Sequence, residues 1–382
     1  MQAGTLLLNG SANSIGGTST VSAGATLRFG NASTHQAGGT IAGAGTLSLT
    51  GGTQTLAGDV TWPVATVAMA GATVVTSPGS ATVAGAFAWS AGFLSGGNGG
   101  ALVLAHTATG TITGGTPHTD ALLVNHGSLT FPAGFTWSGS GTLDNRGTFE
   151  LAGGYSVRTL NSGTLRKTGT GTATLGNTLT TTGTVQVQQG TLQLNGGADA
   201  IGGTVAVASG ATFKLNNTST LQAGLLQSGT GTFEFSGGAV TVLASWAPQG
   251  ETRVTGAQAV FDNAASVAFA ALTQTSGFLD IRRPAATITG PFTRTGGTLR
   301  LDGNTLTFAG TGTQLLDVSV ATTFVNLAVS ANTTLVEVQP GTAAQVSGAL
   351  TNLGVIRKAR TMAAGINHFG LTGVSLEVAA LG

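Results

Sequence analysis

The chain has 382 residues, and only 7% of them are charged, against roughly 25% in an ordinary soluble domain. It contains 63 glycines, no cysteine and a formal net charge of +1. These values exclude a disulfide or cysteine–metal framework, a basic nucleic-acid-binding surface and the high net charge of disordered chains, and no apolar run approaches the ~18 residues of a membrane-spanning helix.

A long internal repeat divides the chain. The segment that starts at Gly4 reads GTLLLNGSANSIGGTSTVSAGATLRFG, and the segment that starts at Gly190 reads GTLQLNGGADAIGGTVAVASGATFKLN. The two segments align without a gap, so that Gly4 corresponds to Gly190. We therefore predict two long repeats, residues 1–186 and residues 187–382, the second continuous with the first.

A shorter period of about 20 residues lies inside the long one. Glycine opens three successive short apolar segments in each copy: Gly4, Gly24 and Gly45, then Gly190, Gly210 and Gly231. Units of this length cannot bury their own apolar face and must stack on their neighbours. The pattern predicts an all-β fold, a parallel β-helix (β-solenoid) of roughly 19 rungs and on the order of 90 Å in length. Parallel crossovers are overwhelmingly right-handed, so we expect a right-handed coil.

Each short segment alternates with period two, as in Thr212-Phe213-Lys214-Leu215. This alternation is typical of a strand with one buried face. Stacking one rung apart would place Leu192, Phe213 and Phe233 in an inward column. It would place Gln193, Lys214 and Glu234 in an outward column, with Lys214 beside Glu234.

Glycine and asparagine indicate where the chain bends. We expect the glycine before each strand to form a corner, because Gly adopts positive φ without a Cβ penalty. Asn-X-Gly recurs at Asn125, Asn145, Asn161 and Asn352, and Asn is a frequent turn residue. Asn125 and Asn145 lie one rung apart, so their amides could stack as a ladder.

The segment from Asn161 to Gly197, NSGTLRKTGTGTATLGNTLTTTGTVQVQQGTLQLNGG, resembles the β-helical stalks of large bacterial surface proteins. These stalks are autotransporter passenger regions and filamentous-haemagglutinin-like adhesins. A degenerate echo runs from Asn352 to Gly382. The resemblance implies export to the bacterial cell surface, a right-handed β-helix and a scaffold or adhesive role.

Carboxylates are the candidate catalytic groups, because some parallel β-helices are polysaccharide-acting enzymes and glycosidases need two carboxylates across a cleft. Asp144 and Glu150 with Arg146 and Arg158 form the densest group, which we interpret as a turn and a solvated strand face. A second local group is interpreted as a loop exit: Asp280, Arg282 and Arg283 beside Pro284. Asp302 beside Arg300 is interpreted in the same way. We therefore expect no enzyme and no catalytic residues.

Histidines offer a possible metal site. His106 and His126 are one short period apart, which predicts neighbouring rungs, and His118 and Asp120 fall between them. Without a third stacked ligand or cysteines, we expect exposed turn histidines and no metal. His35 and His368 stand alone.

Other ligand classes find little support in the sequence. Gly96-Gly97-Asn98-Gly99-Gly100 lacks the aspartate of a calcium-binding nonapeptide. The threonines of residues 169–184 suggest an ice-binding array, but the outward positions vary too much along the chain. We expect no cofactor and no nucleic acid.

The favoured prediction is an extracellular structural stalk or fibre component of a bacterial cell surface. Its ends share one repeat phase, so either the chain is cut from a longer array or copies stack head to tail. The alternative is an adhesin that binds glycan or a host surface along one face; an aromatic strip for this role could come only from Trp62, Trp89, Trp137 and Trp246. A lesser alternative is a polysaccharide-acting enzyme.

Overall fold

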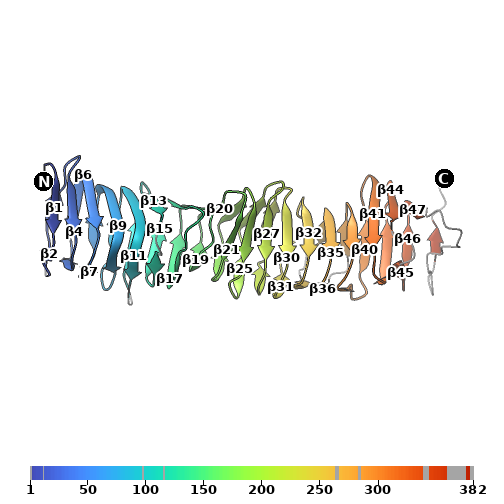
Figure 1. The fold of residues 1–382 in the computed structure, drawn as a ribbon. Coiled ribbons are helices and arrows are strands. Elements are labelled where there is room, and N and C mark those ends of the chain that lie inside the picture. The colour runs from blue at the N-terminus through green and yellow to red at the C-terminus, as the bar shows by residue number, and fades with distance from the viewer. Residues whose placement is uncertain are drawn as a thin grey trace. The chain divides into compact units, whose positions relative to one another are not determined.

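The structure is a computed structural model that describes residues 2–11, 13–96, 99–114, 117–262, 266–282, 285–338, 344–358 and 376–378. Within these ranges the regular elements are β-strands, and they form a parallel β-solenoid of about 17 turns with about 20 residues between rungs (Figure 1). The predicted fold class is confirmed, and the number of turns is close to the number expected. No helix that could cross a lipid bilayer occurs among these residues.

The chain divides into two compact units, Met1–Gln186 and Val187–Gly382. In the first unit, successive turns add strands to three parallel ladders. Ladder A contains β1 (Thr5–Leu8), β4 (Thr26–Phe29), β6 (Thr40–Leu49), β9 (Val64–Val75), β11 (Ala86–Ser95), β13 (Thr109–Ile112), β16 (Ser128–Phe131), β18 (Thr148–Leu151) and β20 (Thr164–Lys167).

Some long strands of this unit turn a corner and serve two ladders. Ladder B contains β2 (Asn13–Ile15), β5 (Ser33–His35), β7 (Thr53–Leu56), the later parts of β9 and β11, β14 (His118–Thr119), and the first residues of β17 (Ser138–Asn145) and β19 (Ser156–Asn161). Ladder C contains β3 (Thr18–Thr20), the first part of β6, β8 (Val60–Trp62), β10 (Ala81–Val83), β12 (Ala101–Leu104), β15 (Leu122–Asn125), the later parts of β17 and β19, and β22 (Leu179–Thr181). The remaining strands here are β21 (Thr172–Leu175) and β23 (Thr184–Val187).

The second unit follows the same plan. Ladder D contains β24 (Thr191–Leu194), β27 (Thr212–Leu215), β30 (Thr232–Phe235), β32 (Glu251–Val254), β35 (Ala271–Gln274), β38 (Phe292–Arg294), β41 (Gly312–Val318), β44 (Thr333–Glu337) and β47 (Val355–Lys358). Ladder E contains β25 (Asp199–Ile201), β28 (Ser219–Leu221), β31 (Ala239–Val242), β33 (Gln258–Phe261), β36 (Phe278–Ile281) and β39 (Thr298–Arg300).

Shorter groups of strands complete the second unit. Ladder F contains β34 (Val267–Phe269), β37 (Ala285–Ile288), β40 (Thr305–Phe308), β43 (Asn326–Val329), β46 (Leu350–Asn352) and β48 (Leu376–Val378). Two further parallel pairs are β26 (Thr204–Val207) with β29 (Leu226–Ser228), and β42 (Thr322–Phe324) with β45 (Ala344–Val346).

Period-two alternation places columns of buried side chains inside the ladders. In ladder D, Leu192 pairs in register with Phe213, and Phe213 with Phe233, and all three side chains are buried. The outward neighbours Lys214 and Glu234 form an ion pair of 3.0 Å between Nζ and Oε1. The predicted inward and outward columns are confirmed.

Rung length varies more than the sequence period suggests. Asn145 pairs with Asn161, a step clearly shorter than the usual period, whereas Phe292 pairs with Leu316, a step clearly longer than it. A register shift within β17 accounts for part of the shorter step, whereas β38 and β41 pair without a shift, so there the corner loop absorbs the additional residues.

Corner glycines serve two different needs. Gly4 and Gly24 have φ of 73° and 74°, the left-handed conformation expected for them. At Gly45 the cause is close approach, because a β-carbon there would collide with the carbonyl oxygen of Ser22 on the preceding turn.

Buried asparagines form a ladder along the inside of ladder C. Asn125 Nδ2 donates to Asn145 Oδ1 (2.7 Å), and Asn145 Nδ2 donates to Asn161 Oδ1 (2.7 Å). Asn161 Nδ2 then donates to Thr181 Oγ1 (3.0 Å). The predicted stacking is confirmed and extends over four rungs. The predicted turn position is wrong: these asparagines end strands and point inward, because their amides satisfy one another inside the core.

Removing one member should therefore cost stability. We expect Asn145→Ala to lower the free energy of unfolding by about 1–3 kcal/mol. The substitution removes the oxygen that accepts from Asn125 and the nitrogen that donates to Asn161, and both neighbouring amides are buried. Chemical denaturation followed by circular dichroism measures this. Asn216→Ala is the matched control, since Asn216 is exposed. Equal effects of the two substitutions would contradict a stabilising ladder.

His35 is a buried core residue, which the sequence did not indicate. It is 2% exposed and lies between the rings of Phe29 and Trp62, with centroid distances of 5.2 and 5.6 Å. Its Nε2 is 3.3 Å from Gln54 Oε1. Burial lowers the pKa of His35, only partly offset by this hydrogen bond, so the folded state favours the neutral imidazole.

The lowered pKa predicts a loss of stability in acid. The unfolded chain takes up a proton near pH 6.5, whereas folded His35 takes it up only at lower pH, so stability falls as the pH drops below about 6.5. We expect the melting temperature to fall less between pH 7 and pH 5 for His35→Phe than for the parent chain. An unchanged difference would show that His35 is not the group responsible.

Candidate functional site

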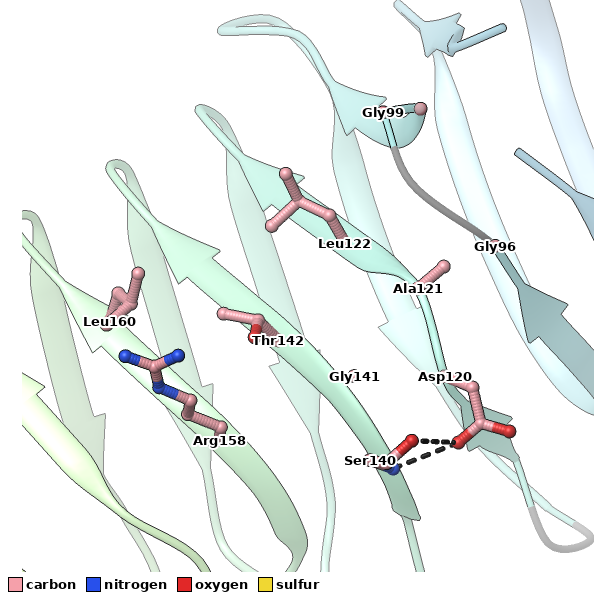
Figure 2. Close-up of a pocket in the computed structure, with 11 residues that line it drawn as sticks. Gly96, Gly99, Asp120, Ala121, Leu122, Ser140, Gly141, Thr142, Arg158 and Leu160 are labelled. Carbon is pink, nitrogen blue, oxygen red and sulfur yellow. Dashed lines mark hydrogen bonds between the residues drawn. The ribbon is translucent and has the colours of Figure 1, made fainter. Parts of the chain in front are cut away.

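A groove crosses the outer surface of ladder C in the first unit. It has a volume of about 530 Å³ and passes over the starts of β12 and β15 and over β17 and β19 (Figure 2). We call it the ladder C groove. Its lining residues are Gly96, Gly99, Gly100, Asp120, Ala121, Leu122, Ser140, Gly141, Thr142, Arg158 and Leu160.

An irregularity in strand pairing lies at the groove. Ser138 pairs with Ser156 and Thr142 with Arg158, so β17 has three residues between these pairs where β19 has one. Two of the three are glycines: Gly139 has φ of 138°, and a β-carbon on Gly141 would collide with the carbonyl oxygen of Ala121. The two glycines let the backbone of this bulge lie close against the preceding turn, where a side chain would not fit.

A carboxylate lies at one end of the groove. Asp120 Oδ1 accepts hydrogen bonds from the backbone N–H (2.9 Å) and Oγ (2.8 Å) of Ser140 (Figure 2). It also lies 3.0 Å from His118 Nε2. These bonds, those of Ser140 first, lower the pKa of Asp120, so the group is ionised at neutral pH. All three contacts reach Oδ1, so Oδ2 has no hydrogen-bond partner among the described residues.

A guanidinium lies farther along the groove. Arg158 is exposed and pairs in register with Thr142 on the neighbouring strand. It makes no hydrogen bond or ion pair with the residues that the structure describes. Leu160, on the same strand, and Leu122, which is 37% exposed, add apolar surface to the lining (Figure 2).

An exposed aromatic pair adjoins the carboxylate end. Phe93 is 50% exposed, pairs in register with His118 in ladder B, and has its ring centroid 5.3 Å from the imidazole. His118 in turn contacts Asp120. The surface therefore continues from an aromatic pair to a carboxylate and then to the groove.

The acidic residues singled out in the sequence form ion pairs. Asp144 Oδ2 lies 2.7 Å from Arg146 Nη2, and Glu150 Oε2 lies 3.7 Å from Arg166 Nη1. Asp144 lies within β17, which corrects the expected turn position. Arg158 does not join this group and lies in the groove instead.

The second charge group is organised around a buried aspartate. Asp280 lies inside β36 and is fully buried, so the expected loop exit is wrong for this residue. Arg282 Nε is 2.9 Å from Asp280 Oδ2, and Arg282 Nη1 is 3.6 Å from Asp262 Oδ2. Arg300 and Asp302 form a separate ion pair. Arg283 and Pro284 lie outside the described residues.

The histidines do not assemble into one site. His106 and His126 stack on neighbouring rungs with centroids 5.0 Å apart, as their spacing predicts. Both follow strands of ladder C, whereas His118 lies in ladder B. In the described parts of the chain, no group of three or more His, Cys, Asp or Glu could hold a metal ion. His368 lies outside the described residues.

Tryptophans do not line the surface. All four are buried in the core, at 0–1% exposure, so they form no aromatic strip: Trp62, Trp89, Trp137 and Trp246. The exposed aromatic ring beside the groove is Phe93, which sequence reasoning missed. The Asp120–Ser140 contact was also missed, although the full period that separates the two residues was a usable signal.

Threonine forms an outward column that the sequence did not reveal. In ladder A, Thr5, Thr26, Thr46 and Thr66 are paired in register, and Thr109, Ser128, Thr148 and Thr164 continue the column beyond Ala86. The second outward position of these strands varies, as in Arg28 and Glu150. The strands therefore do not present Thr-X-Thr at every rung, which is the array that an ice-binding surface would need.

Comparisons with protein-family models, with curated proteins and with solved structures found no match to this chain.

Proposed function

We propose that this chain is a structural stalk segment exposed on a bacterial cell surface. The observation that carries the proposal is the parallel β-solenoid, in which parallel ladders of strands continue from turn to turn within a unit. Such folds are quasi-one-dimensional and extend by adding rungs. The resemblance of residues 161–197 to bacterial surface stalks supports export.

The role proposed is non-catalytic. Acidic side chains in both units are neutralised by neighbouring bases, as in Glu150–Arg166 and Glu234–Lys214. A glycosidase needs two carboxylates that face each other across a substrate cleft. The ladder C groove has one carboxylate, Asp120, in its lining.

The edge of the first rung supports rung-to-rung association. Leu6 is 47% exposed, whereas its register partners Leu27 and Leu47 are 6% and 0% exposed. A hollow of about 230 Å³ lies beside it, lined by Leu6, Ser19, Thr20, Val21 and Leu27. We propose that another rung of the same kind, from a second copy of the chain or from a flanking repeat of a longer chain, covers this apolar edge.

A charge at this edge should block the contact. We expect the purified chain to self-associate as its concentration rises in sedimentation velocity, and Leu6→Arg to suppress that association. Leu226→Arg is the matched control, since Leu226 is 64% exposed on a strand of the second unit. Monomers at every concentration, or equal effects of both variants, would contradict pairing at the first rung.

Surface exposure is tested separately. Antibodies against the chain should label intact cells that produce it, and external protease should remove the signal without permeabilisation. Labelling only after permeabilisation would contradict the proposed location.

A second candidate function is adhesion. The ladder C groove favours it, because this surface combines a carboxylate, a guanidinium without an ionic partner in the described structure, and exposed apolar side chains.

A further inference from the structure

We propose that the ladder C groove binds a saccharide that carries a carboxylate. The inference deepens the adhesive candidate and leaves the stalk role independent of its outcome. Its two anchoring groups are Arg158, for the carboxylate of the sugar, and Asp120, for a sugar hydroxyl (Figure 2).

Arg158 can receive an anion without breaking an existing contact. Its guanidinium is exposed and has no ion pair within the described structure. Planar guanidinium groups bind carboxylates through two parallel N–H···O bonds, which are stronger than neutral hydrogen bonds. A carboxylated ligand therefore gains a charge-assisted contact at this position.

Asp120 has one oxygen left for a ligand. Ser140 and His118 hold Oδ1, which fixes the orientation of the carboxylate. Because the carboxylate is ionised, Oδ2 can accept a hydrogen bond but cannot donate one, so its ligand must supply the donor. A sugar hydroxyl meets this requirement, whereas a second carboxylate would be repelled. The two ends of the groove thus select different groups on one molecule.

The spacing of the two anchors suits a sugar. Arg158 on β19 is in register with Thr142 and, through it, with Leu122 on β15, and Asp120 lies two residues before Leu122. The two anchors are therefore about 10 Å apart across the strands and about 7 Å apart along them, roughly 12 Å between backbone positions. A pyranose ring with a hydrogen bond at each side spans such a distance, since each bond adds ~2.8 Å. Leu122 and Leu160 offer apolar surface for the C–H faces of the ring.

Other macromolecules fit this groove less well. An extended peptide would bind by adding to a strand edge, but β12, β15, β17 and β19 already pair with their neighbours in ladder C. Nucleic acid would place phosphates beside Asp120 as well as Arg158, and the groove has no further Lys or Arg in its lining.

A glycan array tests the proposal with the intact chain. The array displays oligosaccharides with uronic or sialic acids, their neutral counterparts and a poly-glutamate peptide. We expect binding to at least one carboxylated glycan and not to its neutral counterpart. Titration calorimetry with that glycan should then show affinity about tenfold or more weaker for Arg158→Gln and for Asp120→Asn.

Two controls separate recognition from folding. Arg28→Gln removes another exposed arginine, on β4, and should leave the affinity unchanged. Asparagine at position 120 keeps an oxygen that can accept from Ser140, so the thermal melting of Asp120→Asn should match that of the parent chain. The proposal is overturned by an array with no bound carboxylated glycan, by equal binding of neutral glycans or of poly-glutamate, or by affinity that survives Arg158→Gln.

Discussion

Parallel backbone pairing between successive turns is the interaction on which the rest of this chain depends. Each pairing aligns residues about one 20-residue period apart, so one residue type repeated at that step forms a column. Threonines from Thr5 to Thr66 face outward, and Leu27 and Leu47 lie beneath them in the core. The environment of a side chain is therefore set by its place in the rung and by the residues one turn away.

Much of this fold could be predicted because the signals are periodic. The inward Phe213 and Phe233, the outward Lys214 beside Glu234 and the stacked Asn125 and Asn145 all follow from spacing and alternation. What the alternation could not show is the burial of Asp280, which lies between the buried Leu279 and Ile281 on β36 and is itself fully buried. Trp137 and Trp246 lie outside the named strands, so no alternation indicated their burial.

The ladder C groove was beyond prediction for a related reason. It forms where β17 carries two additional residues relative to β19, and such a bulge breaks the period from which the fold was inferred. Asp120 and Ser140 are separated by one full period, but Arg158 follows after a shorter step. The regular repeat therefore predicts the solenoid, whereas the candidate ligand-binding groove lies where β17 departs from the repeat.

The asparagine ladder has a consequence for how a repetitive chain avoids misassembly. Rungs of similar sequence could slip past one another by a whole turn, and an apolar core alone would penalise that shift weakly. A slip of one turn would place Asn145 directly against Leu104, the aliphatic register partner of Asn125, and would leave Asn145 Oδ1 without the Asn125 amide that now donates to it. A few buried amides thus favour one pairing of successive turns over the alternatives, although the repeats are similar in sequence.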